Sequence, residues 1–399
     1  MLTDKKSIET PAFLLDLDIL ECSLKKYQQM ADSKGKKLWP MIKTHKSTEI
    51  ARMQLDYGAS GFLCGTLDEC EAVFKTIVRS GRKDIGIMYA YPVAGYPNIS
   101  RVVKLAGDCD GFCLRIDNYV QAVLLNEAAS EAGVCVNYTV IINSGLNRFG
   151  VVPCCGLESL MNEISDFKHL KFAGISTHPG QVYQAADSEG ILKAARQESG
   201  TMNDAVRTLH KMGIKPQFVS SGSTPTFPHI INDTVINILH PGNYIFMDNI
   251  QISLGCAEEK DCALTVLATV ISAPRDGEFI IDAGSKCLGL DKGAHGNGKI
   301  KGHGRIKDQE RFILDNNTAK DENVFLIYSL SEEVGKIAVQ EVNRDKVNIK
   351  IGDVLEIIPN HSCAAANNTS YYIALRKGIF DRLIHVDMRG NSTAKRMAK

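Results

Sequence analysis

The sequence has no long hydrophobic run and no excess of charge of either sign. No apolar stretch reaches the roughly 18 to 20 residues that span a bilayer, and the first residues lead into no signal-peptide core. Lysine plus arginine and aspartate plus glutamate are both 46 among 399 residues, so the basic excess that favours DNA or RNA binding is absent. We therefore expect a cytoplasmic protein with no nucleic-acid or membrane partner.

Two motifs that would change this interpretation are also missing. The twelve cysteines form no CxxC pair, and the adjacent pair Cys154-Cys155 has poor geometry for a disulfide. A reduced set of thiols is typical of a cytosolic protein. The dinucleotide-binding pattern GxGxxG does not follow the first strand of the predicted sheet.

What the sequence does contain is a regular alternation of short apolar strands and amphipathic helices up to about residue 250. Strands separated by helices indicate βα units and a parallel sheet. Because eight strands fit in about 210 residues, a closed barrel is favoured over a doubly wound open sheet. The fold class is therefore α/β, a (β/α)8 TIM-type barrel plus a mostly β C-terminal domain. The predicted strands are 38–44, 61–66, 84–91, 111–117, 135–143, 172–178, 218–224 and 236–244, and the predicted helices are 47–57, 67–80, 98–107, 118–133, 155–166 and 187–213.

Flanking segments complete the predicted domain organisation. Residues 9–17 form a further strand and a helix follows from Asp18 to about Ala31. Beyond residue 255, strand-like runs alternate with turns of Gly, Asp, Asn and Pro. We expect a barrel over 20–252, a β domain from 1–19 and 253–388, and a flexible tail at 389–399. The strand-like runs are 263–272, 277–283, 324–330, 345–351, 354–359, 371–375 and 385–388, and 291–307 is predicted to be a mobile loop.

The first barrel strand carries the first candidate catalytic residue. Alternation along this strand places Trp39, Met41 and Lys43 on one face. An amine at the tip of a buried strand is desolvated, which favours the neutral form that a Schiff-base lysine requires. The end of this strand faces the active-site mouth of a barrel. Lys43 is thus the candidate, and an exposed strand-end lysine is the ordinary alternative.

A glycine-containing loop follows the seventh strand. It reads Ser220-Ser221-Gly222-Ser223-Thr224-Pro225-Thr226, and its hydroxyls and N–H groups could hold a phosphate. Phosphate sites in such barrels commonly follow strands seven and eight. The turn His240-Pro241-Gly242 after the eighth strand could add further N–H groups. An ordinary Gly-Ser loop remains the alternative, because short glycine motifs are weak signals.

Two more strand ends are polar in the same register. Arg148 follows the fifth strand and could bond an anionic ring oxygen, or could form a rim salt bridge. His178 follows the sixth strand and could equally be a satisfied core histidine. Together with Lys43 and the phosphate loop, they suggest pyridoxal phosphate.

The second domain offers one candidate metal pair. In an extended segment, His361 and Cys363 would point the same way, and imidazole and thiolate are zinc ligands. Two ligands do not close a structural site, so water or substrate would complete the shell. A buried cysteine beside a turn histidine is the alternative.

In this order the motifs resemble the D-serine dehydratase / D-threonine aldolase family of fold-type III pyridoxal phosphate enzymes, relatives of alanine racemase. The resemblance spans about residues 9 to 375. KTHK together with the late PNHxC is its specific part. The shared motifs are Thr10-Pro11-Ala12, Lys43-Thr44-His45-Lys46, Ser221-Gly222-Ser223-Thr224-Pro225, Pro241-Gly242, Asp282-Ala283-Gly284-Ser285-Lys286, Leu330-Ser331-Glu332-Glu333 and Pro359-Asn360-His361-Ser362-Cys363.

The resemblance implies a role for each candidate residue and a homodimer. Lys43 would form the Schiff base with pyridoxal 5'-phosphate and move the α-proton of a D-amino acid. His361 and Cys363 would bind a metal, Zn2+ in a dehydratase or Mn2+ or Mg2+ in an aldolase. The metal would assist loss of the β-hydroxyl. The cofactor-binding residues would be Lys43, Arg148, His178, Tyr183, Gly222, Ser223 and Thr224.

The family contains more than one reaction, and the sequence departs from its usual pattern. Cys363 favours dehydration of D-serine or a related 3-hydroxy-D-amino acid, because the aldolases tend to carry aspartate there. A D-threonine-type aldolase is the next hypothesis, followed by an amino-acid racemase and a non-catalytic pyridoxal phosphate-binding protein. Trp39 and Met41 replace two polar residues that commonly precede the lysine, and Val334 replaces a histidine.

Overall fold

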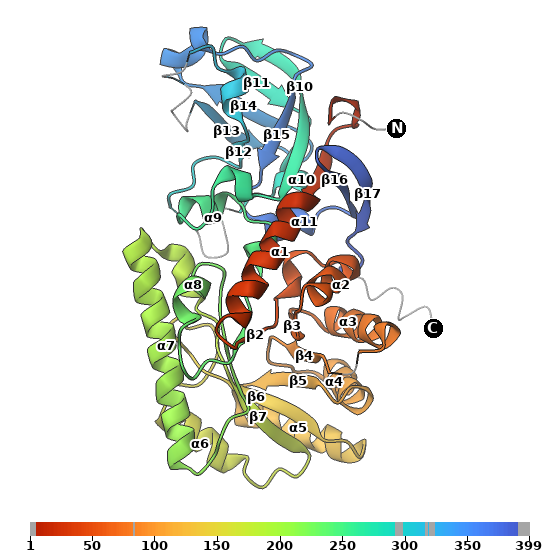
Figure 1. Cartoon of the computed structure of the whole chain (residues 1–399), viewed down its shortest axis with the longest axis vertical. Helices are drawn as coiled ribbons and strands as arrows, with labels where there is room; N and C mark the ends of the chain where they lie inside the picture. Colours follow the sequence, from red (N-terminus) through yellow and green to blue (C-terminus); the bar gives the residue numbers. More distant parts are fainter. Residues whose placement is uncertain (1–4, 83, 292–297, 316–317, 319–323, 390–399) are drawn as a thin grey trace. The chain divides into compact units, whose positions relative to one another are not determined.

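The computed structural model describes residues 5–82, 84–291, 298–315, 318 and 324–389. The chain divides into two compact units, one of residues 1–24 with 243–386 and the other of residues 25–242 with 387–399. Figure 1 follows the chain by colour through both units. Within the described ranges, no helix is both long and apolar enough to cross a membrane.

The second of these units contains a barrel of eight parallel strands. In hydrogen-bonded order the strands run β2, β9, β8, β7, β6, β5, β4 and β3. A parallel bridge between Met41 and Leu63 joins the two ends of this order, so the predicted (β/α)8 barrel is confirmed. The strands are β2 (Lys37–Leu38), β3 (Gly61–Cys64), β4 (Gly86–Tyr89), β5 (Phe112–Ile116), β6 (Val136–Ile141), β7 (Leu170–Ser176), β8 (Phe218–Ser221) and β9 (Ile238–Leu239).

Helices follow the strands as the apolar periodicity predicts. Side-chain caps fix several of their starts: Asn118 accepts from Val120 N at 2.9 Å and Asp187 accepts from Gly190 N at 2.8 Å, satisfying backbone donors that have no intrahelical partner. The helices are α1 (Leu17–Asp32), α2 (Thr48–Asp56), α3 (Leu67–Ser80), α4 (Tyr96–Asp108), α5 (Tyr119–Glu131), α6 (Cys155–Glu163), α7 (Ser188–Lys211) and the short α8 (Phe227–Ile230).

Trp39 lies in the core of the barrel. It is 4 % exposed and packs in one buried cluster with Leu63, Met88 and Cys113. Its ring meets Phe218 edge to face, with centroids 5.3 Å apart, and its Nε1 donates to Ser60 Oγ at 3.1 Å. Trp39 therefore lies just beyond β2, with its side chain in the barrel core.

The other unit is built on a nine-stranded sheet. Its hydrogen-bonded path is β13, β14, β11, β10, β1, β16 and β17, with β15 pairing both β10 and β12. The N-terminal strand β1 pairs antiparallel with β10 and parallel with β16. Its strands are β1 (Ala12–Asp16), β10 (Leu264–Arg275), β11 (Glu278–Ile281), β12 (Arg305–Ile306), β13 (Phe325–Leu330), β14 (Gly335–Val339), β15 (Val354–Ile358), β16 (Tyr371–Arg376) and β17 (Ile379–His385), and its helices are α9 (Asn249–Ser253), α10 (Ser285–Leu288) and α11 (Ser362–Ala366).

The structure corrects the predicted strands of this unit at four places. Residues 345–351 form no strand, because a 3-10 turn over Glu341–Lys346 precedes a single bridge at Val347. Strand β14 was not predicted, and β17 ends at His385, where a strand was expected to begin. Within the predicted mobile loop 291–307, Arg305–Ile306 form the short strand β12, which pairs with β15. Residues 292–297 of this loop lie outside the described residues, as does 390–399 of the predicted tail.

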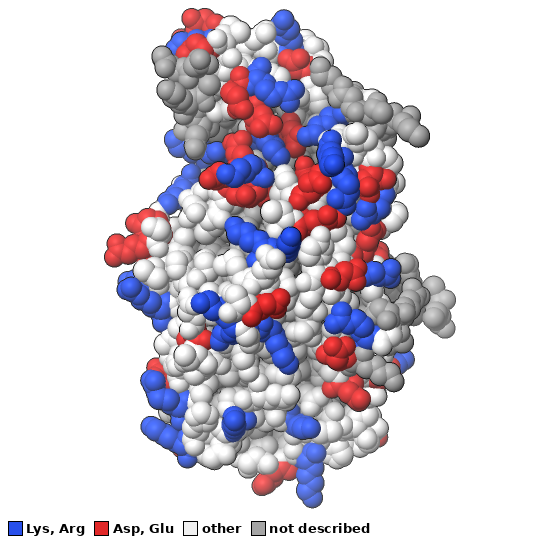
Figure 2. Space-filling model, in the orientation of Figure 1, with Lys and Arg blue, Asp and Glu red and all other residues white. Residues whose placement is uncertain are grey.

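Charges of both signs occur on the face of the molecule that Figure 2 draws. Figure 2 shows lysine, arginine, aspartate and glutamate side chains interspersed on the described part of the face that it draws. This distribution agrees with equal numbers of basic and acidic residues.

Candidate active site

Lys43 lies in a 3-10 turn directly beyond the first barrel strand. The strand was predicted to reach residue 44, but β2 ends at Leu38 and the turn covers Ile42–Thr44. The amides of His45 and Lys46 bond back to Ile42 O at 3.2 and 3.0 Å, and this closure ends the extended backbone. Lys43 is half-buried, and its Nζ donates to Tyr91 Oη at 3.4 Å.

The two lysines of the KTHK motif have different partners. Lys46 Nζ lies 2.7 Å from Glu69 Oε1, and the other oxygen of this buried carboxylate accepts from Gly65 N at 2.6 Å. Lys43 has no carboxylate within 4.0 Å among the described side chains. Lys46 is therefore neutralised by an ion pair, and Lys43 is the amine available for chemistry.

The loop after β8 forms a buried cradle. Gly222 has φ +142°, and a Cβ there would lie 3.2 Å from His240 N, so this position suits glycine. Ser223 and Thr224 are buried. Thr224 Oγ1 has no hydrogen-bond partner within the described part of the chain. Because a buried polar atom without a partner is costly, this hydroxyl fits a bound phosphate.

His178 contacts the cradle. Its Nδ1 donates to Gly222 O at 3.2 Å, which leaves Nε2 unprotonated in the neutral ring. Burial lowers the pKa of His178 to about 3, and the nearby positive charges of Lys43 and Arg148 act in the same direction. The imidazole of His178 is therefore neutral and bonded to the cradle.

Arg148 lies against two aromatic rings at the same mouth. Its guanidinium carbon is 4.4 Å from the Phe149 centroid and 5.5 Å from the Tyr91 centroid. Tyr91 thus contacts both Lys43 and Arg148. A pocket here is lined by side chains that include Arg115, Asn143, Ser144, Arg148, Thr177 and His178.

The pair Arg115–His240 was not predicted as part of the site. Arg115 in β5 is 2 % exposed and donates to His240 Nε2 at 3.2 Å. Burial lowers the pKa of Arg115 to about 10 and that of His240 far below its usual value. One signal was available in the sequence: a single arginine interrupts the apolar strand Phe-Cys-Leu-Arg-Ile, and buried charges cluster at functional sites.

Tyr183 lies in the loop that follows β7, together with His178. It belongs to a 3-10 turn over Gly180–Gln184 and is half-buried. The barrel unit thus holds Lys43, the cradle, His178 and Arg148 at the carboxyl ends of its strands, where barrel active sites form.

The predicted metal pair belongs to the β unit and is not extended. His361 is the N-cap of α11, and Cys363 lies in the first turn of that helix. His361 Nδ1 donates to Asp291 Oδ2 at 2.6 Å. Although burial lowers the pKa of His361, the acidic groups of Cys363, Asp291 and Asp248 raise it well above its usual value. In the described segments, no three histidine, cysteine or acidic side chains form a metal cluster.

Comparisons with known proteins match both units. The family model of the alanine racemase N-terminal domain matches residues 15–250, and that of the putative serine dehydratase domain matches residues 263–375. The D-threo-3-hydroxyaspartate dehydratase of Delftia sp. (strain HT23) is 28% identical over 378 residues, covering 92% of this chain and 94% of that protein. The D-serine dehydratase of Dictyostelium discoideum is 29% identical over 391 residues, with the same two coverages.

Solved structures agree with these matches. The D-threonine aldolase of Filomicrobium marinum has a TM-score of 0.83 at 25% identity and covers 98% of both chains. The solved Delftia dehydratase has a TM-score of 0.84 at 26% identity, covering 96% of this chain and 98% of that one, and one of its variants is in a metal-free form. This chain therefore belongs to the D-serine dehydratase / D-threonine aldolase family, pyridoxal phosphate-dependent lyases with an alanine racemase-like barrel.

Proposed function

We propose that this chain is a pyridoxal 5'-phosphate-dependent dehydratase that acts on D-serine or a related 3-hydroxy-D-amino acid. One observation carries the proposal. Among the described side chains, Lys43 has no carboxylate partner, and it lies at the same barrel mouth as the cradle, in which the buried Thr224 hydroxyl has no hydrogen-bond partner. The similarity to two dehydratases over more than 90% of the chain supports the reaction type.

The residues at the mouth divide the work of binding and proton transfer. Gly222, Ser223 and Thr224 would hold the phosphate through backbone and hydroxyl donors, and Arg148, which packs on the Phe149 ring, would bind the cofactor ring. The cofactor, when bound, supplies an electron sink for charge that develops at the substrate Cα. Lys43 anchors it and moves the Cα proton. His178 stays neutral beside them, and Tyr183 lines the site.

His361 and Cys363 would supply two ligands of a metal ion. Imidazole and thiolate are ligand types that suit zinc, and the metal-free variant of the Delftia dehydratase supports metal use by a relative. The donor chemistry of this pair fits zinc, with further ligands coming from water or substrate. A bound metal would act as a Lewis acid at the β-hydroxyl. By the same resemblance, we infer a homodimer, which the mass in solution tests, and a cytoplasmic location.

Product analysis distinguishes the reactions open to this family. Purified protein is incubated with D-serine and D-threonine, with and without a chelator. We expect pyruvate and 2-oxobutyrate with ammonia, and loss of turnover with the chelator. L-serine serves as the control and should not react.

Other products would contradict dehydration. Aldehyde plus glycine would identify an aldolase, the second candidate, which the likeness to the Filomicrobium aldolase favours. The L-isomer would identify a racemase. Absence of turnover by protein that binds the cofactor would indicate a binding protein. Turnover that survives the chelator would contradict the metal role of His361 and Cys363.

A further inference from the structure

A buried carboxyl group lies behind the phosphate cradle. Glu198, in the middle of α7, is fully buried, and Ser221 Oγ donates to its Oε1. Ser221 is the last residue of β8 and directly precedes Gly222. Within the described ranges, no lysine or arginine forms an ion pair with Glu198, and its Oε2 has no hydrogen-bond partner.

The far side of the cradle contacts the same carboxyl. Thr226 follows the cradle, and its hydroxyl interacts with Glu198. Thr226 Oγ1 lies 3.0 Å from Ser223 Oγ, which also accepts from Thr226 N at 3.3 Å. Glu198 therefore contacts residues at both ends of the loop segment that holds Gly222, Ser223 and Thr224.

The charge state of this carboxyl matters to an anion in the cradle. Burial raises the pKa of Glu198 to about 8, the hydroxyls of Ser221 and Thr226 lower it less, and the carboxylate of Asp233 raises it further. Asp233 also accepts from Asn203 Nδ2 at 3.0 Å. An ionised Glu198 would place a negative charge, shielded little by solvent, directly behind the phosphate.

We propose that Glu198 is a positioning residue of the phosphate cradle, and that the cradle binds a phosphorylated ligand only while Glu198 is protonated. This inference rests on the proposed function, because it takes the loop after β8 to be the phosphate site. Protonated Glu198 holds the hydroxyls of Ser221 and Thr226 without opposing the phosphate charge.

The proposal fixes the direction of a pH effect. By proton linkage, the affinity for the phosphorylated ligand does not change with pH while Glu198 stays protonated. The affinity falls as Glu198 ionises, by up to about tenfold for each pH unit above the pKa of this group. A phosphomonoester is already dianionic there, since its second pKa is about 6. The phosphate charge therefore stays constant while Glu198 titrates.

Calorimetric titration of the full-length, cofactor-free protein with pyridoxine 5'-phosphate measures this effect. The probe carries an alcohol in place of the aldehyde, so it forms no Schiff base with Lys43. We expect the wild-type dissociation constant to rise severalfold or more from about pH 7 to about pH 9. Glu198→Gln keeps the size of the side chain and its capacity to form hydrogen bonds, and it should bind with a shallower profile than the wild type over this range, because only the ring nitrogen of the probe still titrates.

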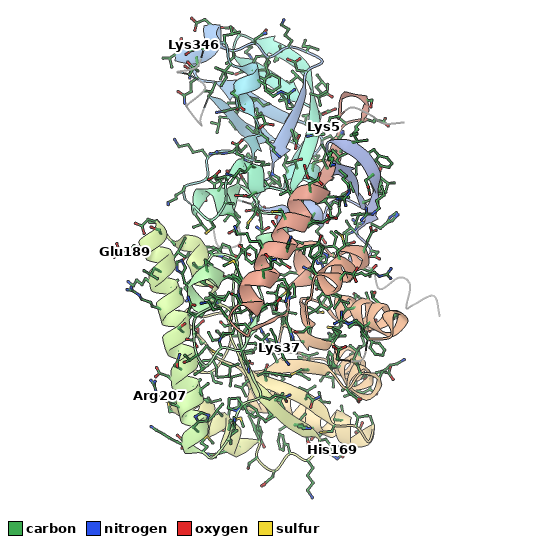
Figure 3. The ribbon with its side chains drawn as sticks, in the orientation of Figure 1. Lys5, Lys37, His169, Glu189, Arg207 and Lys346 are labelled. Carbon is green, nitrogen blue, oxygen red and sulfur yellow. The ribbon has the colours of Figure 1, made fainter. Side chains whose placement is uncertain are left out.

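Two further variants test the mechanism. Ser221→Ala removes a hydroxyl that stabilises the ionised carboxyl of Glu198. The pH above which the affinity for the probe falls should therefore be higher in this variant. Glu189→Gln changes an exposed carboxylate near the start of the same helix, which Figure 3 shows pointing away from the barrel, and should keep the wild-type profile. A purely structural Glu198 would lower the melting temperature of Glu198→Gln without changing the slope.

The outcomes separate the two proposals. A flat wild-type profile, or a Glu198→Gln profile as steep as the wild type, would overturn the role of Glu198 while leaving the phosphate site intact. If Glu198→Gln fails to fold, the pH profiles of probe affinity for the wild type and for Ser221→Ala still test the role of Glu198. Failure of the wild type to bind the probe at any pH would contradict the phosphate cradle itself.

Discussion

At the residue scale, Trp39 packs in the core of the barrel. It is the only tryptophan of the chain, and the family resemblance leads us to expect a polar residue at its position. The chain accommodates its ring with two glycines: a Cβ on Gly61 would lie 2.4 Å from the ring, and one on Gly86 would lie 2.2 Å from it. The glycines and the tryptophan therefore form one packing unit.

Gly86→Ala should destabilise the protein because the added methyl group overlaps the Trp39 ring. Overpacking of this kind lowers the free energy of unfolding by about 1 to 3 kcal/mol. A lower midpoint of urea unfolding measures this loss. Adding Trp39→Leu should recover part of the loss. Gly200→Ala is the control, because no atom lies within 4 Å of its Cβ position in α7 and alanine favours a helix by about 1 kcal/mol. If Gly86→Ala and Gly200→Ala changed the urea midpoint equally, the close packing of the two glycines against Trp39 would be contradicted.

Lys43→Ala should abolish the absorbance of the cofactor Schiff base, because Lys46 is held by Glu69 and cannot replace it. The measurement is the visible spectrum of protein purified with added pyridoxal phosphate. Lys37→Ala, at an exposed lysine in β2, should keep the absorbance. If the yellow absorbance of the Lys43→Ala protein persisted after dialysis, another lysine would carry the cofactor.

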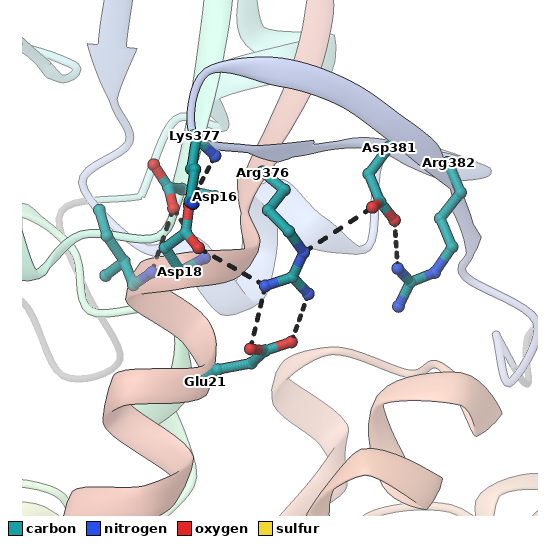
Figure 4. Close-up of polar contacts among 8 residues, drawn as sticks. Asp16, Asp18, Glu21, Arg376, Lys377, Asp381 and Arg382 are labelled. Atoms are coloured by element: carbon teal, nitrogen blue, oxygen red, sulfur yellow. Dashed lines mark hydrogen bonds and ion pairs between the residues drawn. The ribbon is translucent and has the colours of Figure 1, made fainter.

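At the element scale, one arginine joins the β16–β17 hairpin to the first turn of α1. Arg376 donates to both oxygens of Glu21, at 3.1 and 2.6 Å, and lies 3.5 Å from Asp18 and 3.8 Å from Asp381, as Figure 4 shows. Asp18 also accepts from Lys377 N at 2.6 Å. The bidentate geometry orients the hairpin, but the arginine side chain is 38 % exposed.

Glu21→Gln should therefore cost less than about 1 kcal/mol of unfolding free energy, as expected for a solvent-screened ion pair. Asp16→Ala is the matched comparison, because Asp16 Oδ1 accepts from Asp18 N and Ile19 N at the start of the same helix. Loss of such a cap costs about 1 kcal/mol. Urea unfolding at low and high salt measures both, and only the Glu21→Gln effect should shrink with salt. A salt-independent loss in Glu21→Gln would rule out a screened ion pair.

At the scale of the whole molecule, histidines enclosed in the barrel unit make stability depend on pH. Burial lowers the pKa of His45 and His178 to about 3 and lowers that of His240 well below its usual value. The unfolded chain binds more protons than the folded one below about pH 6.5, so folding stability falls as the pH falls through this range. Glu198 acts oppositely, because its raised pKa favours the folded state as the pH falls from about 8.

Unfolding free energy should therefore decrease from about pH 7 to about pH 5, by up to about 1.4 kcal/mol per pH unit for each of these histidines below its unfolded pKa. Urea midpoints at several pH values measure this decrease. His45→Gln should make it shallower, and Glu198→Gln should make it steeper because the offsetting group is removed. Equal midpoints at both ends of the range would contradict neutral buried histidines.

Much of the architecture could be predicted from local sequence patterns. The eight barrel strands follow from short apolar runs separated by helical periodicity, and β1 follows from the apolar segment before Asp18. The prediction fails where tertiary contacts decide. Residues 345–351 are apolar enough for a strand, but they follow a 3-10 turn and make one bridge only. The segment that forms β14 is short and polar on one face, and one of its two partners, β11, is distant in sequence, whereas β13 precedes it directly in a hairpin.

The sequence by itself determined the barrel, the family and the identity of Lys43 as the candidate lysine, because these depend on periodicity and on motifs that are local along the chain. Only the tertiary structure decided which groups are buried without charged partners. Arg115 with His240 and Glu198 with Ser221 are pairs from segments far apart in sequence. The shifted pKa values of Arg115, His240 and Glu198 arise from desolvation, which depends on the packing of the whole barrel. A lone arginine in an apolar strand signals the burial of Arg115, but it does not identify His240 as the partner.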